Sequence, residues 1–174
     1  MKHLLLDGET SKRLSFRKLE QSDFDAWLPF HQDKRTSEFW EGPSPKNPES
    51  ECQEWFDNAF HRYNSHLGGL NALVHKDSGL LIGQCGLLIQ EVDKLQELEI
   101  GYSILPNYWK QGYATEAAKK CKTFAMENNL AKSLISIIHI DNIPSQKVAL
   151  NNGMHWSKTS TFLNNPVHIY RIEL

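Results

Sequence analysis

Residues 95–127 constrain the fold more than any other stretch, because a period of two changes there into a helical period across a single glycine. Up to residue 105, apolar and polar side chains alternate, which predicts a β-strand with one apolar face. The two faces are Leu98, Ile100, Tyr102 and Ile104 against Glu97, Glu99, Gly101 and Ser103. From Gly112 to Glu127 the apolar residues follow a helical spacing, which predicts an amphipathic helix.

Strands and helices are also predicted on both sides of this stretch. We expect strands ending near Leu19 and over residues 70–75, 80–89 and 132–140, and helices capped by Ser22 or Asp23, opened by Pro48, and ended by Gly153. Residues 154–163 and 167–174 are expected to pair through a turn at 164–166. No internal repeat or Gly/Ser-rich linker divides the 174 residues, so we expect a single domain over residues 1–174.

Charge and composition exclude several classes of function. A net charge of -2 argues against non-specific nucleic-acid binding. Three distant cysteines without a CxxC motif indicate buried thiols in a reducing compartment. Near the start only residues 4–6 form an apolar run, too short for a membrane span, so we expect a cytoplasmic protein with no membrane partner. The eight histidines show no metal-ligand spacing, so no metal site is expected.

The turn that opens the predicted helix is a candidate phosphate site. The first turn of a helix leaves backbone N–H groups unpaired at the positive end of its dipole. Gly112 and Ala114 permit a close approach, and Lys110 adds a positive charge. The candidate residues are Lys110, Gln111, Gly112, Tyr113, Ala114 and Thr115. The alternative is that Gly112 only eases a tight strand-to-helix turn.

Two further polar pairs accompany this turn. Glu97 and Glu99 share the polar face of the predicted strand; the alternatives are a solvated face, or a β-bulge that shifts the parity. Asn142 and Ser145 lie three residues apart at a helix start and project to the same side. The alternative for Asn142 is capping of that helix.

Four segments in order resemble the GNAT superfamily of acetyl-CoA-dependent N-acetyltransferases, and within it the ribosomal-protein N-terminal acetyltransferase branch. The segments are RLSFRKLEQSD, LIGQCGL, LEIGYSILPNYWKQGYATEA and DNIPSQKVALNNGM. The resemblance implies an α/β (α+β) fold: a mixed, largely antiparallel sheet of about seven strands, splayed in the middle and flanked by about four helices.

The same resemblance implies roles in binding acetyl-CoA. The turn at Gly112 would hold the pyrophosphate, and the pantetheine arm would pair with the backbone of Ile104 and Leu105 like an added strand. Asn142 would bind the arm, and Ser145 would lie near the thioester sulfur. Lys147 is a candidate for the ribose phosphate, with a solvated helix lysine as the alternative. Trp109 departs from the family signature, which has Arg or Gln at that position.

Acetyl transfer needs a neutral amine, so a carboxylate or water must accept its proton. Glu99 is the expected base, or Glu97 if the strand is bulged, and Ser145 is the candidate for protonating the thiolate. His31, Phe39 and Trp40 are candidates for the acceptor site, although aromatic clusters are commonly core. We expect a monomer or homodimer that acetylates a primary amine such as a protein N-terminus. The alternatives are a small amine (an antibiotic, polyamine or amino-acid derivative) as acceptor, or a non-catalytic acyl-CoA-binding module.

Overall fold

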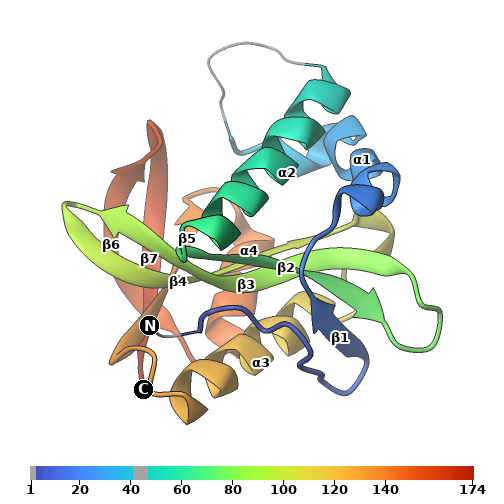
Figure 1. Cartoon of the computed structure of the whole chain (residues 1–174). Coiled ribbons are helices and arrows are strands. Elements are labelled where there is room, and N and C mark those ends of the chain that lie inside the picture. The colour runs from blue at the N-terminus through green and yellow to red at the C-terminus, as the bar shows by residue number, and fades with distance from the viewer. Residues whose placement is uncertain (1–2, 41–46) are drawn as a thin grey trace.

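One seven-stranded sheet organises the chain, with strand order β1-β2-β3-β4-β5-β7-β6 (Figure 1). The computed structural model describes residues 3–40 and 47–174. The strands are β1 (Leu14–Arg17), β2 (Gly68–His75), β3 (Leu81–Val92), β4 (Leu95–Ile104), β5 (Ser133–His139), β6 (His155–Phe162) and β7 (Asn165–Glu173). The α-helices within the described residues are α1 (Phe24–Gln32), α2 (Pro48–Asn64), α3 (Tyr113–Glu127) and α4 (Ile143–Asn151). The predicted fold class is confirmed.

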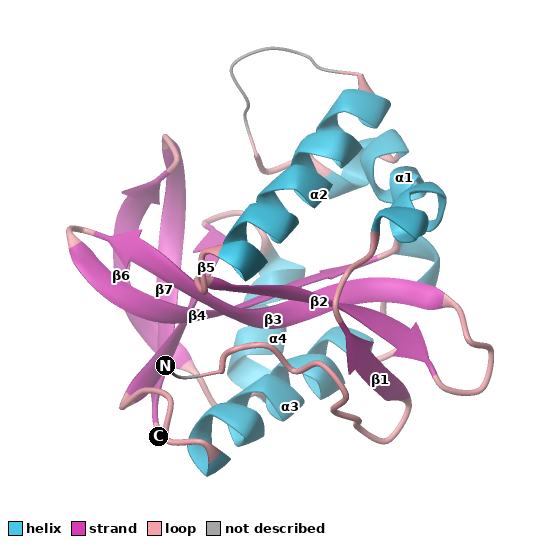
Figure 2. Cartoon of the chain, in the orientation of Figure 1, coloured by secondary structure: helices cyan, strands magenta, loops and turns pink. Residues whose placement is uncertain are grey.

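The helices cover the sheet from both sides (Figure 2). Helices α1 and α2 lie on one face, where Trp27 and Phe56 are fully buried together with Ala72 of β2. Helices α3 and α4 lie on the opposite face, where Ile100 of β4 packs in the larger core with Cys121 of α3. Burial on both faces therefore fixes which side chains of each strand point to which helices.

Local sequence bears on where α1 and α2, the two helices on one face of the sheet, begin. Pro48 occupies the first turn of α2, and the side chain of Asn47 accepts a hydrogen bond of 2.8 Å from the N–H of Ser50. Asp23 precedes α1, but its carboxylate does not cap that helix as expected. It accepts two hydrogen bonds from Arg17 instead, because β1 brings the guanidinium within 2.7 Å.

The two terminal strands form the predicted hairpin with a shifted turn. β6 ends at Phe162 and β7 begins at Asn165, so the turn residues are Leu163 and Asn164 rather than residues 164–166. Both have positive φ angles, 49° and 62°. Two-residue turns with this handedness match the twist of the paired strands, which explains the shift.

The sheet is splayed between β4 and β5. These parallel neighbours align only at Glu99 and Ile135, whereas β3 and β4 pair without interruption from Gly83–Ile104 to Val92–Leu95. The unbroken register shows that β4 has no bulge toward β3, so the predicted parity of its faces holds. Beyond Glu99 the backbones of β4 and β5 diverge, and the splay predicted from the family resemblance is confirmed.

Candidate active site

The turn before α3 has the properties of an anion site. Gly112 has a φ of 83°, a left-handed conformation that favours glycine, and no side chain caps the helix there. The first intrahelical bond runs from the N–H of Glu116 to the carbonyl of Gly112. The N–H groups of Tyr113, Ala114 and Thr115 therefore have no intrahelical acceptor.

Space is open beside this turn. A Cβ on Gly112 would meet only the Nη2 atom of Arg13, at 3.5 Å. Gly112 is thus required by its backbone angle, and it also leaves the approach to the helix end free. The turn interpretation of Gly112 is confirmed, and the phosphate-site interpretation stays a prediction.

Arg13 is a residue of this region that the sequence analysis missed. Its Nε donates to the carboxylate of Glu116 at 2.7 Å, and its Nη1 donates to the carbonyl of Gln111 at 2.9 Å. Its guanidinium lies 4.0 Å from the ring centroid of Tyr113. A segment ahead of β1 therefore reaches the first turn of α3, a contact across about a hundred residues that no local pattern reveals.

Trp109 turns away from the anion site. Its indole N–H donates to the carbonyl of Ile104 at 2.7 Å, and the guanidinium of Arg35 lies 5.1 Å from its ring. The side chain that departs from the family signature thus packs against the end of β4.

The backbone groups of β4 that are free to pair with an added strand lie earlier in the chain than the predicted Ile104 and Leu105. The N–H of Leu105 donates to Ile82 of β3, so that group points away from the gap. In an antiparallel pair the alternate residues face the other side. By this alternation, both backbone groups of Tyr102 and the N–H of Ile104 face β5, whereas the Ile104 carbonyl is already bonded to Trp109. The backbone groups open to an added strand therefore belong to Tyr102 and Ile104 rather than to Ile104 and Leu105.

Glu99 lies at the point where the sheet splays. Its carboxylate accepts hydrogen bonds from Gln90 Nε2, at 2.8 Å, and from the N–H of Ile137 on β5. Burial raises the pKa of this carboxyl, opposed by these two hydrogen bonds and by the charge of Arg62. A carboxylate of raised pKa is a stronger proton acceptor than an ordinary glutamate.

Glu97 has a different environment although it shares a face with Glu99. It forms an ion pair of 2.5 Å with Arg171 of β7, and Arg171 also donates to the hydroxyl of Ser133. This carboxylate joins β4 to β7 across the intervening β5. Of the two predicted base candidates, the geometry favours Glu99.

Helix α4, which follows β5, is connected to β4 near the splay. Asn142 caps the helix, since its side chain accepts from the N–H of Ser145 at 3.2 Å. The hydroxyl of Tyr102 donates to the carbonyl of Ser145 at 2.7 Å and so connects β4 to α4. Lys147 is exposed on the same helix. Asn142 and Ser145 are thus brought together next to β4, and the capping alternative for Asn142 is confirmed.

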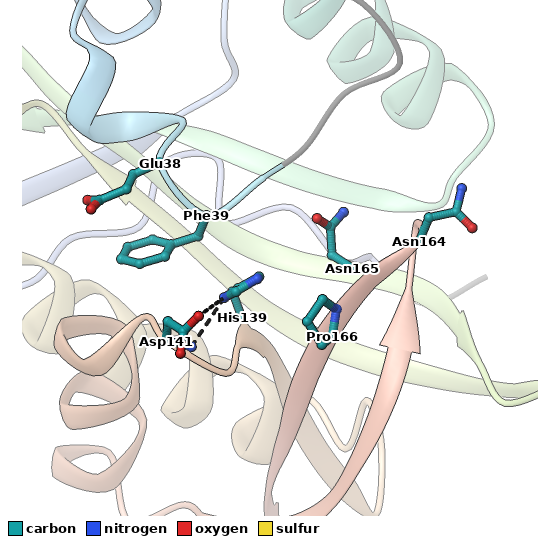
Figure 3. Close-up of a pocket in the computed structure, with 7 residues that line it drawn as sticks. All are labelled: Glu38, Phe39, His139, Asp141, Asn164, Asn165 and Pro166. Carbon is teal, nitrogen blue, oxygen red and sulfur yellow. Dashed lines mark hydrogen bonds and ion pairs between the residues drawn. The ribbon is translucent and has the colours of Figure 1, made fainter.

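A pocket of about 480 Å³ opens at the end of β5 (Figure 3). Its lining residues come from the segment after α1, from the end of β5 and from the β6–β7 turn: Glu38, Phe39, His139, Asp141, Asn164, Asn165 and Pro166. The ring of Phe39 stacks on that of His139 with centroids 5.6 Å apart, and Trp40 meets the same imidazole edge-on at 6.3 Å. The predicted acceptor residue Phe39 therefore lines this pocket, and Trp40 contacts one of its lining residues, His139.

His31 lies elsewhere. Its imidazole packs edge-on against Trp55 and Phe30 between α1 and α2, and burial lowers its pKa to about 4. The core alternative describes His31, because it belongs to the helix face that packs against α2.

The pocket and Glu99 share one face of the sheet. The carboxylate of Glu99 is bonded to the N–H of Ile137, and His139 follows two residues later on β5. Two residues of a strand span about 7 Å and place their side chains on the same face. The backbone contact of Glu99 on β5 therefore lies two residues from His139, which lines the pocket.

Comparison with known proteins identifies the family. A family model described as "Acetyltransferase (GNAT) domain" matches residues 13–155. The chain belongs to this family and is a GNAT N-acetyltransferase. Among curated relatives, it is 30% identical over 122 residues to the uncharacterized protein YkkB of Bacillus subtilis, covering 69% of this chain and 70% of that one. It is 28% identical over 149 residues to the uncharacterized N-acetyltransferase YnaD of the same organism, covering 83% and 81%.

Solved structures share the fold. An acetyltransferase from Agrobacterium tumefaciens superposes with a TM-score of 0.79 at 23% identity, covering 95% of this chain and 94% of that one. A putative ribosomal-protein-serine acetyltransferase from Vibrio cholerae gives 0.77 at 17%, covering 97% and 99%. Mycobacterium smegmatis RimJ in complex with CoA-disulfide gives 0.74 at 15%, covering 95% and 88%.

The described residues show neither a membrane-spanning helix nor a metal-binding cluster. None of their helices is both long enough and apolar enough to cross a membrane. In residues 3–40 and 47–174, no three His, Cys, Asp or Glu side chains are grouped so as to hold a metal ion.

Proposed function

We propose that the enzyme transfers the acetyl group of acetyl-CoA to a primary amine that enters through the Phe39–His139 pocket, with Glu99 as the base. The observation that carries this is the position of Glu99, a half-buried carboxylate of raised pKa at the splay of the sheet. The uncapped turn at Gly112 and the pocket at the end of β5 would supply the rest of the site.

Acetyl-CoA supplies the activated acyl group. The open N–H groups of Tyr113, Ala114 and Thr115 would hold its pyrophosphate, assisted by Lys110 and Gln111. The backbone of Tyr102 and Ile104 would pair with the amides of its pantetheine arm. These residues fit the group, because the α3 turn leaves donors unpaired and the space beside Gly112 open.

Glu99 would take the proton from the amine, directly or through a water molecule. An α-amino group has a pKa of about 8 and a lysine amine about 10.4, so the former loses its proton more readily near neutral pH. The hydroxyl of Ser145 is the candidate for protonating the thiolate. Within the described residues it forms no side-chain hydrogen bond, and only the backbone of Ser145 is engaged, with Asn142 and Tyr102.

A protein N-terminus is the first acceptor that we propose. The V. cholerae neighbour is described as a putative ribosomal-protein-serine acetyltransferase, and the low pKa of an α-amine suits a single carboxylate base. A small cationic amine is the second candidate. The pocket carries the carboxylates of Glu38 and Asp141, and no lysine or arginine is among the residues found to line it. Its volume of about 480 Å³ also lies in the range of small-molecule sites.

The test is thiol release from acetyl-CoA with a panel of N-terminal peptides and small mono- and diamines. We expect turnover with at least one amine and a higher kcat/KM for the class that fits the pocket. A matched pair, Glu99→Gln and Glu97→Gln, separates the roles of the two carboxylates, because both lie on the same face of β4. Binding of coenzyme A without turnover of any amine would favour a non-catalytic binding module and contradict the proposal.

A further inference from the structure

We propose that Arg13 binds the pyrophosphate of coenzyme A. It would provide the cationic side chain that position 109, a tryptophan in this chain, does not supply to the turn. The inference rests on the proposed function, since it concerns the acyl donor of that reaction. It adds a residue that precedes β1 to a site otherwise made by β4 and α3.

The turn lacks a side-chain donor from position 109. The indole N–H of Trp109 is bonded to the Ile104 carbonyl, so this side chain offers nothing to an anion at the helix end. The guanidinium of Arg35 lies over the Trp109 ring, but its fork is occupied by Asp33, with contacts of 2.9 and 2.6 Å. Apart from Lys110, which is part of the turn itself, a cation that serves the helix end has to come from another segment.

Arg13 is held at the helix end from three directions. Glu116 binds its Nε, the carbonyl of Gln111 binds its Nη1, and the ring of Tyr113 supports its flat face. Glu116 is fixed in turn, because it also accepts the backbone N–H of Arg13 and the hydroxyl of Ser11, both at 2.7 Å. A guanidinium that is oriented before ligand binding loses little conformational entropy when an anion arrives.

The free side of the guanidinium faces the open side of the turn. In the part of the chain that the structure describes, Nη2 of Arg13 donates no hydrogen bond, whereas Nε and Nη1 are both used. Nη2 lies 3.5 Å from the position that a Cβ would take on Gly112, which is the space the glycine leaves empty. An anion seated on the N–H groups after Gly112 would therefore lie within reach of Nη2, as a charge-assisted donor.

The guanidinium remains an effective donor although Glu116 neutralises its charge. Phosphate recognition by arginine uses the directed N–H bonds of the fork as well as the net charge. Glu116 itself lies in the first turn of α3, where the helix dipole favours a carboxylate. The Arg13–Glu116 ion pair is thus favourable at this position, and it leaves Nη2 of Arg13 available to an anion.

The test compares donors with and without the pyrophosphate. Calorimetry measures the affinity of the full chain for coenzyme A, for 3′-dephospho-coenzyme A and for pantetheine, which lacks phosphate. For Arg13→Gln we expect about a tenfold loss of affinity for the first two ligands and an unchanged affinity for pantetheine. Arg13→Lys should recover only part of the loss, because lysine lacks the fork.

The control is Arg17→Gln, which removes another β1-region arginine paired with a carboxylate, here Asp23. It should leave all three affinities unchanged. An equal loss for pantetheine and coenzyme A with Arg13→Gln would mean that Arg13 only supports the fold, and it would overturn the proposal. A loss confined to the ligand with the 3′-phosphate would also overturn it, since the contact would then be with the ribose phosphate. If the wild-type chain binds none of the three ligands, the proposed function itself fails.

Discussion

Replacing Glu99 by Gln is expected to lower activity and to change the pH dependence of stability at the same time. Glutamine keeps the size of the side chain and one acceptor oxygen, but it cannot take a proton. General-base catalysis contributes about 100-fold or more, so kcat should fall by at least about that factor. Affinity for coenzyme A should stay within about twofold, because the pyrophosphate turn and the edge of β4 are untouched.

The stability effect follows from the raised pKa of Glu99. A carboxyl whose pKa is higher in the folded state stabilises the fold fully below pH 4.5, its ordinary value, and this contribution is lost as pH rises through the raised pKa. Each unit of difference is worth about 1.4 kcal/mol. Glutamine also loses one of two acceptor bonds, to Gln90 or to Ile137, at about 1 kcal/mol. That cost is independent of pH, so it does not change how the free energy of unfolding depends on pH.

The measurement is the thermal midpoint of wild type and variant between pH 4 and pH 9. We expect the wild type to lose stability relative to Glu99→Gln above pH 4.5, by about 2–4 °C per kcal/mol for a chain of this length. Glu97→Gln is the matched control: breaking its ion pair with Arg171 should destabilise the fold by about 1–3 kcal/mol and leave kcat nearly unchanged. A difference between wild type and Glu99→Gln that is flat from pH 4.5 to 8 would refute the raised pKa. Unchanged turnover at saturating substrates would remove Glu99 from the mechanism.

Three other changes test the remaining parts of the site. Gly112→Asp should abolish detectable binding of coenzyme A, through a strained positive φ and an added negative charge; Gly79→Asp, at a φ of 70° in an open turn, is the control and should bind normally in calorimetry. Phe39→Ala should raise the KM for the amine about tenfold without altering affinity for coenzyme A, and an unchanged KM would remove the pocket from acceptor binding. His31→Phe should flatten the loss of stability on acidification: the lowered pKa of His31 stabilises the neutral fold fully above pH 6.5 and progressively less as pH falls toward about 4, which urea unfolding at several pH values would detect.

Local patterns were sufficient for much of the fold. The alternation around Glu99 correctly placed Glu97 and Glu99 on one face, because β4 pairs with β3 without a bulge. Pro48 marked the start of α2, and Gly112 marked the turn into α3, since both residues have backbone restrictions that depend on near neighbours only.

Contacts between distant segments account for what the sequence missed. Nothing near Glu97 indicates that Arg171 pairs with it, so the sequence kept Glu97 as a second candidate base. The bond from Trp109 to Ile104, which occupies the carbonyl at the end of the open backbone edge, depends on the indole rotamer. Arg13 reaches its helix only because β1 is folded beside the N-terminal end of α3. Such pairings follow from tertiary packing, which periodicity does not encode.

At the splay, the carboxylate of Glu99 also helps to hold β4 and β5 together. Where the backbone ladder between β4 and β5 stops, the strands are joined by side chains: Glu99 accepts from the N–H of Ile137, and the hydroxyl of Ser136 donates to the carbonyl of Ile100 at 2.9 Å. Protonation of Glu99 weakens its hold on that amide. Hydrogen exchange at the amide of Ile137 should therefore report the charge of Glu99, and each proton that Glu99 takes up would weaken this contact between β4 and β5.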